Sequence, residues 1–215
     1  MAGQTKFARV IRLQGGDPSK AEEGRKRWKE EIYPVLKQQP GFRGVSTMTN
    51  PRTGEGLSVS YWDSEKALRD ATAKVQPMGD KLRQATGRGI VEEDECDVAV
   101  EERFQPPKAG TYVRVTTLEA DPGKVEAGIE TYKSKVVPTV RQQPGARAAI
   151  LLVNRKTGRT FSGTIWNTEE ELRRSESAVS GLRQEAAQAV GARSPKVEMF
   201  EINFTEILTP VTANR

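Results

Sequence analysis

The sequence contains no histidine and a single cysteine, and these absences exclude several kinds of chemistry. Without histidine there can be no Ser-His-Asp or Cys-His catalytic group, no histidine general base and no His-ligated haem, and most zinc sites are excluded. Cys96 has no partner for an internal disulfide, so a reducing, cytoplasmic setting is expected. Any reaction would depend on arginine, lysine, tyrosine, serine, carboxylates or the substrate's own reactivity. We therefore expect no metal and no haem, flavin or other cofactor.

Long apolar runs are also missing. No segment approaches the roughly 20 apolar residues that a membrane-spanning helix needs, and residues 1–14 lack the apolar core of a signal peptide. We therefore expect no membrane partner. The charge is high but mixed, because 34 Lys and Arg oppose 29 Asp and Glu and leave +5. The basic residues are scattered, which is typical of solvated helix faces and predicts no nucleic-acid partner. The acidic run at residues 92–95 is interpreted as a loop and not as a metal site.

The most informative feature of the sequence is an internal repeat. Most of the second copy lies 104 positions after the first, as Pro34 and Pro138 show (138 − 34), and the first strand lies 105 positions after its match. The matched pairs include Arg9 and Arg114, Asp17-Pro18 and Asp121-Pro122, Gln38-Gln39-Pro40-Gly41 and Gln142-Gln143-Pro144-Gly145, Thr53-Gly54 and Thr157-Gly158, and Trp62 and Trp166. This many ordered matches indicate a tandem duplication. We predict a first repeat at residues 1–104, a linker at 105–110 and a second repeat at 111–215.

Each copy shows the pattern β-α-β-β-α-β. Residues 7–13 and 112–118 are β-rich, and each is followed by an Asp-Pro pair that can cap a helix. Two strands, at about 43–50 and 56–63, flank a hairpin loop that ends in glycine. A polar second helix follows, and a last strand is expected near residues 97–104 and 196–204. The fold class is therefore α+β: two ferredoxin-like units packed sheet to sheet as a pseudo-dimeric α/β barrel.

The motifs of each copy resemble those of the antibiotic biosynthesis monooxygenase superfamily. The similar features are Pro-Gly-Phe-Arg-Gly after the first helix, a hairpin, and Ser-x-x-x-Trp-Asp-Ser-Glu before the second helix. The resemblance implies dimeric α/β barrels, here fused in one chain that is a monomer or a homodimer. It also implies cofactor-independent oxidation of aromatic substrates. In that mechanism the substrate phenol loses its proton and the anion reacts with dioxygen.

The resemblance also implies a set of site residues. The family tryptophan is present as Trp62 and Trp166, and the family arginine is assigned to Arg83 and Arg183 because both stand in Leu-Arg-Gln. The family asparagine is replaced by Ser58 and Ser162. The family tyrosine falls on Leu68 and Leu172 and is lost. A pocket is therefore expected in each half, whereas loss of the asparagine and tyrosine counts against the family reaction.

Strand alternation adds two further inferences. Ser58, Ser60 and Trp62 should share one strand face, which by family analogy faces the helices. Each tryptophan can be a core anchor, a pocket wall or both. Arg9 and Arg114 lie in first strands expected to be buried on both faces, so each needs a partner. That partner is either a carboxylate of the other half or an anionic ligand.

The two copies differ on their second strand. Residues 45–48 read Val-Ser-Thr-Met, whereas residues 149–152 read Ala-Ile-Leu-Leu. The first pocket should therefore be the more polar one, and one half alone can be active. The leading functional hypothesis is a small-molecule-binding barrel, with cofactor-free monooxygenation of an aromatic or quinone-like substrate as its possible activity. The alternative is a non-catalytic ligand-binding or stress-associated barrel. RNA binding ranks below both, because the RNA-recognition signature is absent.

Overall fold

The computed structural model describes residues 7–192 and 194–208, whose strands form one closed antiparallel barrel. Parts of the segments considered above, residues 1–6 and 209–215, lie outside the described residues. The strands are β1 (Phe7–Gly15), β2 (Phe42–Thr49), β3 (Gly56–Trp62), β4 (Arg88–Arg103), β5 (Tyr112–Glu119), β6 (Ala146–Val153), β7 (Arg159–Trp166) and β8 (Lys196–Ile207). Their order around the barrel is β1-β3-β2-β8-β5-β7-β6-β4. The sequence-based prediction of two ferredoxin-like units joined in an α/β barrel is confirmed.

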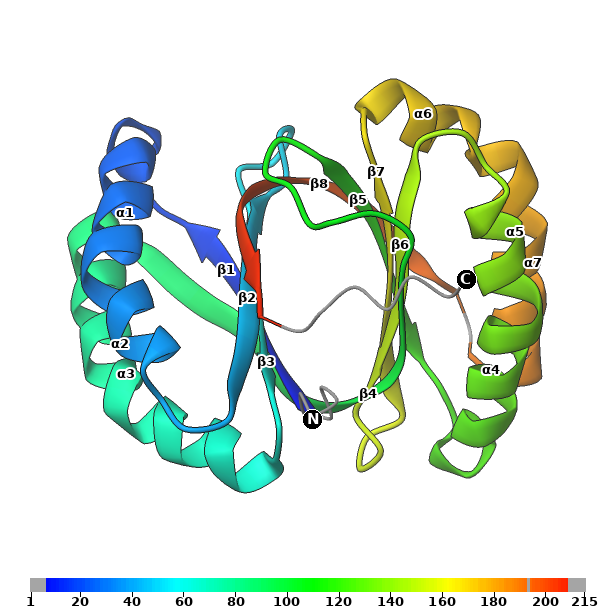
Figure 1. Cartoon of the computed structure of the whole chain (residues 1–215), viewed down its shortest axis with the longest axis horizontal. Helices are drawn as coiled ribbons and strands as arrows, with labels where there is room; N and C mark the ends of the chain where they lie inside the picture. Colours follow the sequence, from blue (N-terminus) through cyan, green and yellow to red (C-terminus); the bar gives the residue numbers. More distant parts are fainter. Residues whose placement is uncertain (1–6, 193, 209–215) are drawn as a thin grey trace.

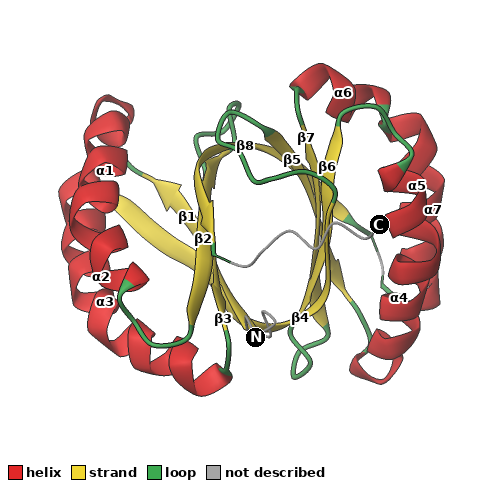
Figure 2. Cartoon of the chain, viewed as in Figure 1, coloured by secondary structure: helices red, strands yellow, loops and turns green. Residues whose placement is uncertain are grey.

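The helices lie outside the barrel in two groups, one for each unit (Figure 1). Their bounds are α1 (Ala21–Arg27), α2 (Tyr33–Lys37), α3 (Glu65–Thr86), α4 (Val125–Thr131), α5 (Val137–Arg141), α6 (Glu169–Arg174) and α7 (Glu176–Ala189). Short 3-10 turns, Pro18–Lys20 and Pro122–Lys124, precede α1 and α4, and each follows an aspartate whose side chain accepts a backbone N–H. Colouring by structure type shows the strands as a central layer and the helices on its two outer sides (Figure 2).

The first helix of each unit changes its winding before its proline. Trp28–Ile32 is π-helical between α1 and α2, and Tyr132–Val136 is π-helical between α4 and α5. Pro34 and Pro138 follow in the first turns of α2 and α5. A proline has no N–H and its ring crowds the preceding turn, so a wider turn relieves the conflict without breaking the helix. Each proline is thus accommodated by a change of helical spacing.

The fourth strand of each unit closes the barrel by pairing with both units. The first part of β4 pairs with β1, from Arg88 to Asp97, and its last part pairs with β6, from Asp97 to Arg103. In the same way β8 pairs first with β5 and then with β2. The two sheets are therefore joined along both edges, which removes the exposed sheet edges that each unit would have alone.

The acidic run at residues 92–95 was expected to be a loop, and this expectation was wrong. These residues lie inside β4, which begins at Arg88, and they pair with Arg9 to Arg12 on β1. Cross-strand arginines explain the difference: Arg9 Nε donates to Glu93 Oε1 at 2.8 Å and Arg12 Nε to Glu92 Oε2 at 2.9 Å. Ion pairs between neighbouring strands allow a charged segment to form a ladder that its own propensity would disfavour.

Strand alternation divides the apolar residues between the barrel interior and two helix-covered cores. Leu57, Val59 and Tyr61 point into the barrel and pack with residues of the second unit such as Val113 and Phe200. Trp62 lies on the opposite side with residues of α2 and α3. The predicted face assignment of β3 is therefore confirmed. No helix in the described part of the chain is long and apolar enough to cross a membrane.

Candidate functional site

A cavity lies between the sheet and the helices in each unit, but the two differ greatly in size. The first cavity, between β1–β3 and α1–α3, has a volume of about 740 Å³. The second, between β5–β7 and α4–α7, has about 70 Å³. Pockets for small organic molecules usually have about 300–1,000 Å³. The first cavity lies within that range, whereas the second has room for only a few water molecules.

The first cavity has a polar floor and an apolar roof. Its floor is formed by alternate residues of the sheet: Arg9 and Ile11 on β1, Thr47 on β2, and Ser58 and Ser60 on β3. Its roof comes from the helices. The roof residues are Trp28, Ile32, Leu36, Val75 and Leu82. Charged side chains such as Lys20, Arg25 and Lys26 border the cavity on the same side. An apolar wall with some placed polar groups is the usual character of a small-molecule site.

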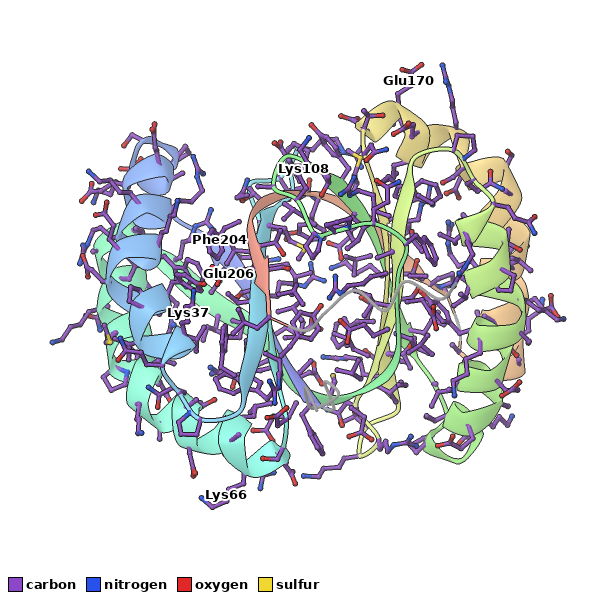
Figure 3. The ribbon with its side chains drawn as sticks, in the orientation of Figure 1. Lys37, Lys66, Lys108, Glu170, Phe204 and Glu206 are labelled. Atoms are coloured by element: carbon purple, nitrogen blue, oxygen red, sulfur yellow. The ribbon has the colours of Figure 1, made fainter. Side chains whose placement is uncertain are left out.

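The second unit completes the wall of the first cavity. Glu201, Ile202, Asn203 and Phe204 of β8 line it because β8 pairs with β2. The Phe204 ring lies 5.5 Å from Trp28 and 4.8 Å from Tyr33, centroid to centroid, and Figure 3 labels it on the side of β8 nearest the helices of the first unit. Asn203 Oδ1 accepts a hydrogen bond from Thr49 Oγ1 at 2.6 Å. Sequence reasoning missed these residues, although the predicted closure of the barrel could have indicated that a last strand reaches the other unit.

Six of the eight residues expected at the sites line a cavity. Arg9, Ser58 and Arg83 line the first. Arg114, Ser162 and Arg183 line the second. The two tryptophans differ from the expectation, because both pack behind the cavity walls with Trp62 at 2% and Trp166 at 0% exposure.

Each tryptophan nevertheless holds a polar residue of the strand face. Trp62 Nε1 donates to Ser60 Oγ at 3.0 Å, and Trp166 Nε1 donates to Thr164 Oγ1 at 3.1 Å. A buried indole N–H needs an acceptor, and the residue two positions earlier on the same strand face supplies it. The Trp62 indole therefore fixes the hydroxyl of a residue that lines the first cavity.

Arg83 and Arg183 are not equivalent positions, which corrects the pairing inferred from Leu-Arg-Gln. The helix caps Ser64 and Thr168 keep the 104-residue spacing (168 − 64), which matches Arg183 to Gly79 (183 − 79). Arg83 therefore lies one helical turn further along its helix. Arg83 pairs with Asp80, and a Cβ at Gly79 would lie 3.0 Å from Arg83 Nη1. The glycine leaves open in the first unit the space that an arginine occupies in the second.

The first-strand arginines have partners within their own units, not in the other half as one alternative proposed. Arg9 Nη2 lies 2.7 Å from Glu93 Oε1 of β4. Arg114 Nη1 donates to Ser175 Oγ at 3.0 Å, and its Nη2 donates to the Leu172 carbonyl at 2.5 Å. Burial lowers the pKa of Arg114 to about 10, and the charge of Arg183 adds to the effect while Glu176 opposes it. Arg114 thus belongs to a packed, charged wall.

A more apolar strand and an additional arginine fill the second cavity. Tyr132 stands where the first unit has Trp28, and its hydroxyl donates to the Ile150 carbonyl at 3.1 Å. Leu151 replaces Thr47 and Val153 replaces Thr49. Arg183 is held by Glu176 through two bonds of 2.8 Å. The divergence of the second strand therefore separates an open cavity from a filled one.

Within residues 7–192 and 194–208, no group of three or more His, Cys, Asp or Glu side chains is placed to hold a metal ion. The polar groups of the first cavity include hydroxyls, the Asn203 amide, the Arg9–Glu93 ion pair and further basic side chains. Such groups can orient an organic molecule by hydrogen bonds and can stabilise an oxyanion.

Comparison with known proteins supports the fold and shows a family resemblance in the first unit. Residues 7–75 match the family model described as antibiotic biosynthesis monooxygenase. Two uncharacterized proteins of Mycobacterium tuberculosis, Rv2557 and Rv2558, are similar in sequence. The first is 25% identical over 182 residues, 85% of this chain and 81% of its own. The second is 24% identical over 209 residues, 97% of this chain and 88% of its own.

Solved structures share the fold at low identity. A candidate monooxygenase from Fusobacterium nucleatum has a TM-score of 0.75 at 13% identity, with 96% of each chain covered. An anthrone oxidase-like protein has a TM-score of 0.69 at 14% identity, covering 99% of this chain and 97% of its own. A haem-degrading enzyme from Listeria monocytogenes has a TM-score of 0.50 at 11% identity, covering 90% and 98%. The internal repeat and the barrel show a tandem chain of two ferredoxin-like units, and the first of these units matches the antibiotic biosynthesis monooxygenase model.

Proposed function

We propose that this protein binds one small, largely apolar organic molecule per chain, in the first cavity. The observation that carries the proposal is the difference between about 740 Å³ in the first unit and about 70 Å³ in the second. Duplication has left the second unit free to become a filled support, which also supplies Asn203 and Phe204 to the first site. An aromatic or quinone-like molecule suits a site with an aromatic wall and a hydroxyl-bearing floor.

The proposal predicts that the first cavity will close when two of its residues are replaced by their counterparts from the second unit. Thr47→Leu with Gly79→Arg places in the first unit the residues found at the matched positions 151 and 183. Arginine favours a helix more than glycine does, and the tight neighbour of a Cβ at Gly79 is the flexible end of Arg83, so the variant should fold. We expect the affinity for N-phenyl-1-naphthylamine, a neutral apolar fluorophore, to fall at least about tenfold in a fluorescence titration.

Ala73→Arg is the matched control, because it adds an arginine to an exposed position of the same helix. It should bind the fluorophore as the unaltered chain does. Native mass spectrometry of the purified protein should show at most one bound molecule per chain. Unchanged binding by the Thr47→Leu/Gly79→Arg variant would contradict the proposal.

A second candidate function is cofactor-free monooxygenation at the same site, and the Arg9–Glu93 pair favours it. Both residues line the first cavity, and the side chain of Glu93 is 39% exposed. In this role Glu93 accepts the proton of a phenolic or enolic substrate and Arg9 stabilises the resulting oxyanion. The anion then reacts with dioxygen. For anthrone, one oxygen atom enters the ring carbon as a new carbonyl and the other leaves as water, giving anthraquinone.

Anthrone in aerated buffer therefore tests the reaction. We expect anthraquinone to form faster with the protein than in buffer, and Glu93→Gln to reduce the enzymic rate about a hundredfold, because positioned proton transfer contributes about that much. The variant should still bind N-phenyl-1-naphthylamine. A rate equal to that in buffer, or an unaltered rate with Glu93→Gln, would exclude this role of Glu93 and leave ligand binding as the function.

A further inference from the structure

Two arginines lie at the edge of the first cavity. Arg25 on α1 and Arg88 at the start of β4 both line the cavity. Among residues 7–192 and 194–208, neither arginine lies within 4.0 Å of a carboxylate oxygen. The other arginines of the cavity differ, since Arg9 pairs with Glu93 and Arg83 with Asp80. Arg88 Nη2 donates to the Gly54 carbonyl at 3.0 Å, which leaves its other N–H groups available.

The fold brings these two cations together. Helix α1 crosses the end of α3 at close range, because a Cβ on Gly24 would lie 3.0 Å from the Thr86 methyl. Arg25 follows Gly24, and Arg88 follows the left-handed Gly87 that ends α3. Burial and then the charge of Arg25 lower the pKa of Arg88, so the two charges are close enough to repel. Arg88 is half-buried and Arg25 is exposed, and an anion placed between the two guanidinium groups would relieve their repulsion.

Gly56 provides the space in which the Arg88 guanidinium lies. A Cβ on Gly56 would be 2.7 Å from Arg88 Nη1, so a larger residue would displace that group. The backbone of Gly56 is not in the left-handed region, so space and not conformation explains the glycine. The cavity floor and the arginine are thus fitted to each other.

The filled second unit lacks all three features. Ile129 stands at the position of Arg25 (129 − 25 = 104), Ala192 at that of Arg88 (192 − 88 = 104) and Thr160 at that of Gly56 (160 − 56 = 104). The alignment of Ala192 is secure, because Gly87 and Gly191 both follow the second helix with positive φ, at 72° and 69°. At these three matched positions, all among the described residues, the two arginines and the space for Arg88 therefore accompany the open cavity and are absent from the filled unit.

We infer that the molecule held in the first cavity carries an anionic group, a carboxylate or another oxyanion, which binds Arg88 and Arg25 at the cavity edge while its apolar body lies under Trp28. This inference rests on the proposed function and specifies the class of ligand. Guanidinium groups bind oxyanions through charge-assisted and often bidentate hydrogen bonds, which a neutral analogue cannot make.

Two fluorophores that differ by one anionic group test the inference. The anionic probe is 1-anilinonaphthalene-8-sulfonate, and the neutral probe is N-phenyl-1-naphthylamine, which lacks the sulfonate. We expect Arg88→Ala and Arg25→Ala each to lower the affinity for the anionic probe about tenfold, which is the usual effect of losing a hydrogen bond to a charged group. The affinity for the neutral probe should change less than about twofold. Gly56→Thr should act like Arg88→Ala, because it displaces the guanidinium while keeping the charge.

Arg174→Ala is the control for loss of one positive charge, since Arg174 is exposed on α6, away from the first cavity. It should leave both affinities unchanged. If Arg88→Ala and Arg25→Ala lower the affinities for both probes equally, or leave the affinity for the anionic probe unchanged, the inference is overturned while the cavity remains the binding site. Failure of the Thr47→Leu/Gly79→Arg variant to reduce binding of the neutral probe would instead overturn the proposed function, and the inference with it.

Discussion

Replacement of Arg12 by alanine is expected to lower the free energy of unfolding by about 3–5 kcal/mol, which is the usual result of removing one partner from a buried ion pair. Arg12 points into the barrel with 3% of its side chain exposed. Its Nε donates to Glu92 Oε2 and its Nη1 to Glu198 Oε1, both at 2.9 Å. Burial lowers the pKa of Arg12, but the bonds to the two carboxylates outweigh this and raise the pKa above its ordinary value.

The effect should be large because Arg12 joins the two units. Glu92 belongs to β4 of the first unit and Glu198 to β8 of the second. The side chain of Glu198 is only 10% exposed. Arg159 of β7 extends the network, with Nη1 2.8 Å from Glu92 and 3.1 Å from Asp94. Without Arg12, two carboxylates remain inside the barrel without their main cation.

Urea denaturation followed by circular dichroism measures this loss. Arg27→Ala is the control, because Arg27 at the end of α1 pairs with the exposed Glu31 one turn later and its removal should have a much smaller effect. A loss for Arg12→Ala as small as that for Arg27→Ala would show that the network does not hold the units together.

Replacement of Trp166 by alanine is expected to cost about 3–5 kcal/mol of stability, as for other large-to-small core substitutions. Trp166 is 0% exposed, in the core between β7 and the helices of the second unit. Its indole also donates to Thr164 and lies 6.0 Å from the Arg114 guanidinium. Alanine would leave a large cavity in a unit that the rest of the sequence has filled.

Trp28→Ala supplies the comparison. Trp28 is half-buried and forms part of the roof of the first cavity, where the chain already borders open space. It should therefore destabilise the protein less than Trp166→Ala in the same denaturation experiment, while weakening binding of N-phenyl-1-naphthylamine. Equal destabilisation by the two variants would contradict the distinction between a filled and an open unit.

Several features of the site could be predicted from the sequence because they depend on local rules. Alternation along a strand placed Ser58 and Ser60 on the helix-facing side of β3, where both line the first cavity. Thr47 in the first repeat corresponds to Leu151 in the second, and this difference indicated that the first pocket is the more polar one, because matched positions of a repeat occupy the same place in each unit. The role of Trp62 could not be decided in this way, since a tryptophan at the end of a strand can either pack in the core or line a cavity.

Other features could be seen only in the tertiary structure. The Leu-Arg-Gln match paired Arg83 with Arg183, but the helix caps set the alignment by which Arg183 corresponds to Gly79. The acidic run was interpreted as a loop, but it forms a strand, and the arginines that stabilise it lie some 80 positions earlier, as for Arg12 and Glu92. Asn203 and Phe204 line a cavity of the other unit, which no local pattern could show.

The sequence by itself determined that this protein is a duplicated ferredoxin-like chain, because periodicity, helix caps and repeated motifs are properties of neighbouring residues. It also determined that histidine chemistry is absent. Only the tertiary structure decided which unit is open, which arginines have carboxylate partners and which strand completes the site. Those outcomes depend on contacts between residues far apart in the chain, and packing and charge pairing at such contacts are set by the closed barrel.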